Sequence, residues 1–165
     1  MKIKTNLVNF SNGIDLECGS RLNSFDLMVE TYGKLNDDGS NAVLVCHAFS
    51  GNHRAAGKSS DDNQAGWWDE IIGPNKAIDT NKYYVVCSNN LGGCSGSTGP
   101  TSINPDNNEI YGKDFPAVSV NDWVKSQKML SDKMSIEKWS FVVGGSIDGM
   151  QALQWAISFP DNVKK

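Results

Sequence analysis

The sequence predicts an α/β fold, in which helices cover a mostly parallel β-sheet. Short apolar runs at residues 42–46, 82–88 and 139–143 have the composition of strands that are buried on both faces. Helical periodicity appears over residues 120–134 and 147–158. Buried strands that alternate with helices favour parallel pairing through right-handed crossover connections.

The first predicted helix has a clear start signal. Ser119 precedes the periodic stretch and Asp122 stands three residues later, as in a capping box. The residues at helical spacing form one mostly apolar face, which we expect to point into the core: Trp123, Val124, Gln127, Leu130 and Met134.

The second predicted helix, roughly residues 147–158, ends before Pro160, because the residue preceding a proline disfavours helical backbone. Its apolar side chains are expected to face inward: Met150, Leu153, Ala156 and Ile157.

Two other segments have weaker signals. Residues 25–33 alternate between apolar and polar, which predicts a half-exposed strand. Residues 88–116 are rich in Asn, Gly, Ser and Pro and lack any regular period, which predicts a long loop. Its scattered Leu, Ile, Tyr and Phe residues favour a packed loop.

Composition limits the classes of function. A chain of 165 residues can form one domain with a hydrophobic core but not two of ordinary size. Its net charge of −4 offers no basic surface for nucleic acid or an acidic membrane. No apolar run approaches the roughly 18 residues of a membrane span. The N-terminal residues lack the apolar stretch of a secretory signal.

The cysteine pattern favours free thiols in a reducing cytoplasm. The four cysteines form no C-x-x-C pair, and Cys46 and Cys87 each end an apolar run, where burial is expected. Cys46, His47 and His53 could be considered as zinc ligands, but a fourth ligand at familiar spacing is missing. No metal site is therefore predicted.

A phosphate-binding loop is also disfavoured. Residues 51–60, "GNHRAAGKSS", follow a buried strand and include Gly57-Lys58-Ser59. However, five residues separate Gly51 from Gly57 where the P-loop needs four, and no apolar helix follows.

The segment "VVGGSIDGM", residues 142–150, predicts a strand, a tight turn and a helix. This is the context of a nucleophile elbow, with Ser146 as the nucleophile and Gly144 and Gly145 allowing the turn. The Ile147 N–H would then face a developing oxyanion. The local pattern fits an ordinary N-cap serine at position 146 equally well.

A second segment favours the elbow. Residues 47–51, "HAFSG", follow the earlier buried strand, where such folds place the loop that supplies the other oxyanion N–H. The Phe49 N–H is the expected donor. His47 is interpreted as a structural residue that shapes this loop.

Four stretches carry a family resemblance: "NAVLVCHAFSGNHRAAG", "GWWDEIIGPNKAIDTNKYYVVCSNNLGGCSGSTGPTSINP", "YGKDFP" and "VVGGSIDGMQALQWAISFP". Together they closely resemble the homoserine O-acyltransferases of the α/β hydrolase fold, from about residue 25 to the last residue. The combination of "NNLGGCSGSTGP" with the elbow is very specific. The resemblance implies transfer of an acyl group from coenzyme A to L-homoserine, in methionine biosynthesis.

The resemblance also implies a mechanism. Ser146 attacks the thioester, the Phe49 and Ile147 N–H groups hold the oxyanion, and homoserine then takes the acyl group. Acetyl-CoA and succinyl-CoA are both candidate co-substrates, and the variants "SGNHRAAG" and "LQWAISFP" are closer to the succinyl group. No bound cofactor is implied. A homodimer like that of the family is an open expectation, because the family's lid lies beyond residue 165.

The chain departs from the family after the elbow. In this fold the triad acid and histidine follow the nucleophile, yet the 19 residues after Ser146 contain no histidine. Residues 1–165 are therefore predicted to be the N-terminal part of a single α/β hydrolase domain, without the later strands, the lid or the rest of the triad. Such a chain would be weakly active or inactive, and marginally stable or self-associating. A serine esterase or hydrolase on the same fold and a non-catalytic, vestigial fragment stay open as alternatives.

Asp148 is the second departure, because the family has glycine two residues after the nucleophile. Its side chain is expected to crowd the approach of helix to strand. Its charge is expected to oppose the oxyanion, by up to about 4 kcal/mol at roughly 4 Å.

Overall fold

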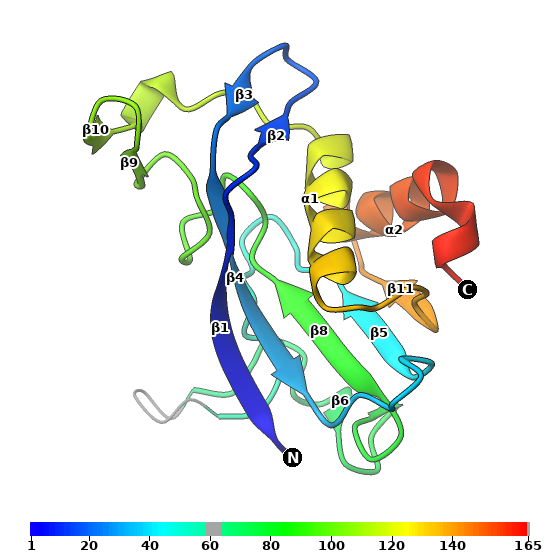
Figure 1. Cartoon of the computed structure of the whole chain (residues 1–165). Helices are drawn as coiled ribbons and strands as arrows, with labels where there is room; N and C mark the ends of the chain where they lie inside the picture. The colour runs from blue at the N-terminus through cyan, green and yellow to red at the C-terminus, as the bar shows by residue number, and fades with distance from the viewer. Residues whose placement is uncertain (59–63, 165) are drawn as a thin grey trace.

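A computed structural model describes residues 1–58 and 64–164, and its centre is a five-stranded sheet (Figure 1). The strand order is β1-β4-β8-β5-β11. These strands span, in that order, Ile3–Phe10, Phe25–Tyr32, Tyr84–Ser88, Ala42–Val45 and Phe141–Val143. The last two residues of the segment 51–60 lie outside the described residues.

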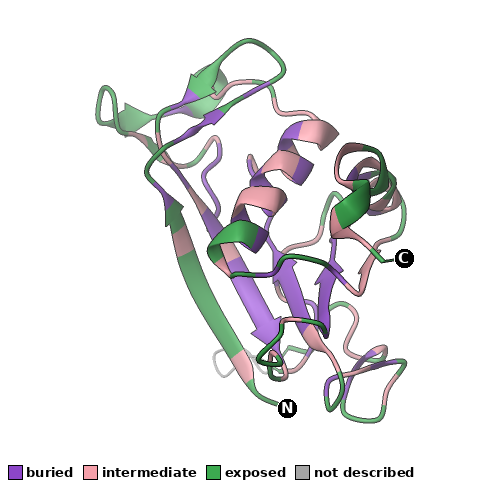
Figure 2. Cartoon of the chain, turned by 45° about the vertical axis from the view of Figure 1, so that its right-hand side comes forward, coloured by how far each residue is buried: buried purple, intermediate pink, exposed green. Residues whose placement is uncertain are grey.

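The sheet combines antiparallel and parallel pairing. β8, β5 and β11 pair in parallel, which confirms the α/β prediction for the three apolar runs. β1 and β4 add an antiparallel edge. No strand was predicted at β1, and the exposure of its side chains explains why. Most β1 side chains stay exposed because the strand lies at the edge of the sheet, so they carry little apolar pattern (Figure 2).

Both faces of β5 and β8 are covered, as their continuous apolar runs predicted. The same prediction is wrong for β11, whose three residues are only half-buried because the strand lies at the edge of the sheet. On β5, Ala42 and Leu44 pack on the side of the two long helices, whereas Val43 and Val45 join a second cluster with Ala55. The last four residues of β4 are also buried, so the expectation of a half-exposed strand at residues 25–33 is wrong there. β4 lies between β1 and β8, and it is buried more fully than its alternation of apolar and polar residues suggested.

Helix α1 (Val120–Lys133) begins at the predicted capping box. The Asp122 N–H donates to the Ser119 hydroxyl at 3.2 Å, and the Ser119 N–H donates to the Asp122 carboxylate at 3.0 Å. Val124, Gln127 and Leu130 are buried, so the predicted inward face is confirmed. This helix lies over the sheet in Figure 1.

Helix α2 (Ile147–Ser158) has the predicted bounds but the opposite orientation. The four side chains expected to point inward are all exposed: Met150, Leu153, Ala156 and Ile157. The buried residues are instead Asp148, Gln151 and Trp155. Their polar groups can be buried because they form hydrogen bonds with one another and with Gln127 on α1. Hydropathy does not reveal such hydrogen bonds. Figure 2 shows the exposed side of α2.

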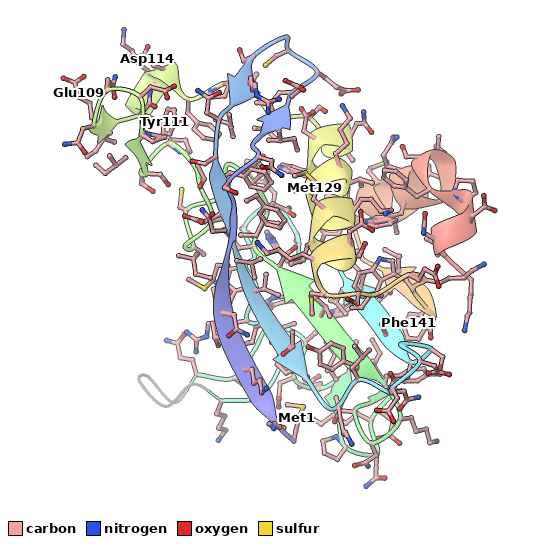
Figure 3. The ribbon with its side chains drawn as sticks, viewed as in Figure 1. Met1, Glu109, Tyr111, Asp114, Met129 and Phe141 are labelled. Atoms are coloured by element: carbon pink, nitrogen blue, oxygen red, sulfur yellow. The ribbon has the colours of Figure 1, made fainter. Side chains whose placement is uncertain are left out.

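The long loop after β8 is packed, as expected, and carries a small hairpin. Tyr111 is buried and meets Phe115 edge to face at 5.2 Å between ring centroids. Glu109, Tyr111 and Asp114 mark this region in Figure 3. The remaining short elements are β2 Ile14–Asp15, β3 Arg21–Leu22, β6 Ile72–Gly73, β7 Ile78–Asp79, β9 Ile103–Asn104, β10 Glu109–Ile110, η1 Gly112–Asp114 and η2 Pro160–Asn162.

The four cysteines are free, as the sequence predicted, with Cys46 and Cys87 buried and Cys18 and Cys94 exposed. None of the helices in the described residues combines the length and the apolar character that crossing a bilayer requires.

The exposed apolar side of α2 leads to a prediction of self-association. Leu153 and Ile157 are 58% and 65% exposed, and burying them against another copy would be favourable. We expect concentration-dependent association in sedimentation velocity, and a shift toward monomer when Leu153→Ser and Ile157→Ser are combined. Ile110→Ser is the matched control, because Ile110 is 64% exposed but lies in the distant hairpin. A wild-type monomer with a sharp, high melting transition would contradict this expectation.

Candidate active site

The site begins where two parallel strands end side by side. The Cys46 N–H donates to the Val143 carbonyl at 2.9 Å, which extends the pairing of β5 with β11 past the last strand residue. The loops that follow, residues 47–51 and 144–147, therefore leave the same edge of the sheet as neighbours. β11, marked by Phe141 in Figure 3, carries the second loop.

Ser146 has the backbone of a strained turn. Its φ of 64° and ψ of −129° fall outside the regions that non-glycine residues commonly adopt. The residue is exposed at the N-terminus of α2, yet its side chain makes no capping hydrogen bond. An ordinary N-cap serine would have extended backbone and a capping hydroxyl. The local geometry therefore matches a nucleophile elbow better than a cap.

Gly144 makes this turn sterically feasible. A β-carbon at position 144 would lie 2.7 Å from the Asp148 carbonyl carbon and would also collide with the Asp148 β-carbon. A β-carbon at Gly145 would meet nothing within 4 Å. The close approach of helix to strand thus depends on the first glycine and is indifferent to the second.

The two expected oxyanion donors occupy the adjoining loops. Ile147 is the first residue of α2, where N–H groups have no partner within the helix and the helix dipole favours negative charge. Phe49 is 84% exposed in a turn closed by the Gly51 N–H donating to the Ala48 carbonyl at 2.7 Å. Within the described residues, neither N–H donates to another protein group. Both are free to face an incoming ligand.

His47 joins two loops instead of standing free. Its Nδ1 lies 2.9 Å from the Ala48 carbonyl, and its Nε2 accepts the Asn90 N–H at 3.0 Å. This arrangement places the proton on Nδ1 and leaves no lone pair for another group. Burial also lowers the pKa of His47, so the ring is neutral. It is not available as a base for Ser146.

His53, the other histidine, is buried with Nδ1 unpartnered among the described residues. Burial, with smaller contributions from Arg54 and His47, lowers its pKa to about 4. In the described part of the chain, no three metal-binding side chains gather into a cluster.

A cavity of about 450 Å³ adjoins the Phe49 loop. Its walls come from residues 47–51, 90–95 and 115–118 and from Trp123 on α1, and Ser146 is not among them. The volume is in the range of small-molecule sites. The walls are largely apolar, and the indole N–H of Trp123 is already donated to the Leu91 carbonyl at 2.8 Å.

Asn90 is the polar residue of this cavity that sequence reasoning missed. The residue is 6% exposed, and its side-chain oxygen has no partner among the described residues. An unpaired buried amide oxygen costs free energy unless a ligand or water satisfies it. The available signal was the position of Asn90 directly after a buried strand, before the glycine-rich loop.

Asp148 is buried behind the elbow, 2% exposed. The crowding expected from its side chain is relieved, because Gly144 leaves room for it. Burial raises the pKa of this carboxyl to about 6. Near neutral pH, most molecules therefore hold a buried negative charge on the residue that follows the proposed oxyanion donor Ile147.

Comparison with known proteins gives a consistent family match. A family model described as "alpha/beta hydrolase fold" matches residues 41–165. A homoserine O-succinyltransferase of Psychrobacter arcticus is 58% identical over 99% of this chain, and one of Hahella chejuensis is 60% identical over 95%. Those matches cover 37% and 41% of the relatives, so the chain spans about two fifths of their length.

Solved structures of two activities resemble the chain closely. The crystal structure of esterase E22 superposes with a TM-score of 0.92 at 38% identity, covering 99% of this chain and 46% of that protein. A homoserine O-acetyltransferase from Bacillus anthracis gives a TM-score of 0.91 at 39% identity, covering 99% and 45%.

Gly144→Ala is expected to destabilise the protein by about 1–3 kcal/mol, because the new methyl group would collide with Asp148. Gly145→Ala is the matched control and should change the free energy of unfolding by less than about 0.5 kcal/mol. Urea denaturation followed by circular dichroism measures both. Equal effects of the two substitutions would argue against close packing at position 144.

Asp148→Asn is expected to stabilise the protein above pH 6. A folded pKa of about 6 exceeds the usual unfolded value of roughly 3.9, so this group's contribution is most favourable at low pH and is lost as the pH rises from 4 to 6. The full penalty is on the order of 3 kcal/mol. The difference in unfolding free energy between variant and wild type should therefore grow from pH 4 to pH 7. A difference in unfolding free energy that does not change with pH would contradict the raised pKa of Asp148.

Proposed function

The chain belongs to the α/β hydrolase fold family, and from that premise we propose that it is part of a homoserine O-acyltransferase with Ser146 as its nucleophile. The observation that carries the proposal is the strained, exposed Ser146, which follows the strand end paired with the one that leads into the Phe49 loop. The similar relatives are named as homoserine O-succinyltransferases, which supports homoserine as the substrate. The product would be an activated homoserine ester for methionine biosynthesis in the cytoplasm.

The proposed reaction has two transfers. The Ser146 Oγ attacks the thioester carbonyl, and the coenzyme A thiolate leaves, to be protonated to the thiol. The negative charge of each tetrahedral intermediate is held by the Phe49 and Ile147 N–H groups. The hydroxyl of homoserine then attacks the acyl-enzyme, which forms the ester and frees Ser146.

The base that takes the Ser146 proton is assigned to a part of the protein beyond these residues. Both ring nitrogens of His47 are engaged, which removes this histidine from the role. The share of the relatives that the chain spans leaves room for an acid and a histidine after Ser146. Acylation by this chain alone is therefore expected to be slow.

We assign succinyl-CoA as the donor, with acetyl-CoA as the alternative. The two relatives at 58% and 60% identity are named for succinyl transfer, whereas the structural neighbour at 39% is named for acetyl transfer. The cavity beside Phe49 is the proposed place for the small reactants, since bound reactants would displace water from its largely apolar walls and so favour transfer over hydrolysis. There the Asn90 oxygen would accept a hydrogen bond from the ammonium or hydroxyl group of homoserine.

A serine esterase is the second candidate, because esterase E22 superposes as well as the acetyltransferase does. The two functions differ in the acceptor of the acyl group. An esterase passes it to water, so it would consume its donor without homoserine. A homoserine acyltransferase releases free coenzyme A beyond one equivalent only when homoserine is added.

Intact-protein mass spectrometry after incubation with succinyl-CoA or acetyl-CoA tests the proposal. We expect a slow acyl adduct that peptide mapping places on Ser146, and L-homoserine should discharge it. Ser146→Ala should abolish the adduct, whereas Ser11→Ala, at an exposed turn residue, should leave it unchanged. A chain that forms no adduct with either donor would be a non-catalytic fragment, and donor consumption independent of homoserine would favour the esterase.

A further inference from the structure

A chain of hydrogen bonds connects the elbow to the core between α1 and α2. The Trp155 indole N–H donates to the Gln127 oxygen at 2.7 Å, and the Gln127 amide donates to the Gln151 oxygen at 2.6 Å. The Gln151 amide in turn faces Asp148 Oδ1 at 3.5 Å. All four residues are at most 2% exposed. We call these four residues the elbow relay.

The direction of the elbow relay is fixed by chemistry. An indole N–H can only donate, so the Gln127 oxygen must face Trp155 and the Gln127 nitrogen must face Gln151. The same reasoning turns the Gln151 nitrogen toward Asp148. The relay therefore ends with the Gln151 amide donating toward Asp148. This donor is compatible with Asp148 as a carboxylate or as a carboxylic acid.

The surroundings of Asp148 support its charge poorly. The 3.5 Å contact from Gln151 is long for a hydrogen bond. The titratable groups that face Asp148 from the packed elements are the Cys46 thiol after β5 and the Cys87 thiol on β8. Burial, with a smaller contribution from Asp148, raises the pKa of both thiols, so they stay neutral. Among the described residues, no lysine or arginine offsets the Asp148 charge.

Asp148 also touches the elbow itself. Its β-carbon and backbone pack against Gly144 at the end of β11, two residues before Ser146, and its N–H donates to the Gly145 carbonyl at 3.3 Å. A change in how this side chain sits or is solvated is therefore transmitted directly to the turn that holds Ser146 and Ile147.

We propose that Asp148 is a positioning residue whose protonation state, transmitted through Gly144 and the elbow relay, sets the backbone and the electrostatics of the Ser146 elbow. The neutral acid is the form that favours catalysis, because it removes a negative charge from the residue that follows Ile147, whose N–H would hold the oxyanion. It also gives the carboxyl a hydrogen to donate. The catalytic part of this inference rests on the proposed function, whereas the coupling of Asp148 to the elbow does not.

The coupling is tested by NMR titration of the chain between pH 4 and 8. We expect the Trp155 indole, the Gln151 side-chain amide and the Ile147 backbone amide to shift together, with a common midpoint near 6. Asp148→Asn should remove this shared transition. Asp148→Gly is the second variant and should remove it too, so the test does not depend on one substitution folding.

Asp161→Asn is the matched control, because Asp161 is an exposed acid just past the same helix. That variant should keep the shared transition unchanged. Separate midpoints for the three resonances, or a transition that survives in both Asp148 variants, would overturn the coupling.

The catalytic consequence is read from the pH profile of Ser146 acylation by succinyl-CoA. Relative to wild type, Asp148→Asn should accelerate acylation by about tenfold or more at pH 8 and by much less at pH 5. Equal acceleration at both values, or none, would overturn this part. If the NMR transition is present but no variant forms an acyl-enzyme, the proposed function fails while the coupling stands.

Discussion

The parallel pairing of β5 with β11 is the constraint on which the rest of the site depends. The last hydrogen bond of this pairing runs from the Cys46 N–H to the Val143 carbonyl. It joins the ends of two strands that are almost one hundred residues apart in sequence. The loop with Phe49 and the turn with Ser146 both start from this point. The proposed nucleophile and oxyanion donors thereby follow neighbouring strand ends that the sheet holds in place.

The turn at Ser146 shows how local strain is supported by packing. A non-glycine residue at positive φ is unfavourable by itself, and it persists only where its surroundings determine it. Here the support comes from both sides: Gly144 lets α2 approach β11 closely, and Trp155 is buried between α1, Trp139 and Phe159. The helix is therefore anchored through its polar and aromatic side, and its aliphatic side is left on the surface.

This anchoring explains why the sequence interpretation chose the wrong face of α2. Helical periodicity located α2 correctly, but hydropathy chose the wrong face, because it counts Gln151 and Asp148 as surface residues. In the structure, Gln151 is satisfied by Gln127, a residue of another helix. No pattern within one helix reveals a partner in a different element, and the same limit hid the hydrogen bond from the Asn90 N–H to His47.

The sequence alone determined the positions of the three parallel strands, the bounds of both helices, the capping box at Ser119 and the order of strand, turn and helix around Ser146. These features depend on neighbours within a few residues, where propensity, periodicity and glycine placement act. The tertiary structure alone decided which face of α2 is buried, how His47 is engaged and where the Asp148 carboxyl lies. Those outcomes depend on which segments meet in space, because a hydrogen bond or a steric contact between distant residues forms only after the chain has folded.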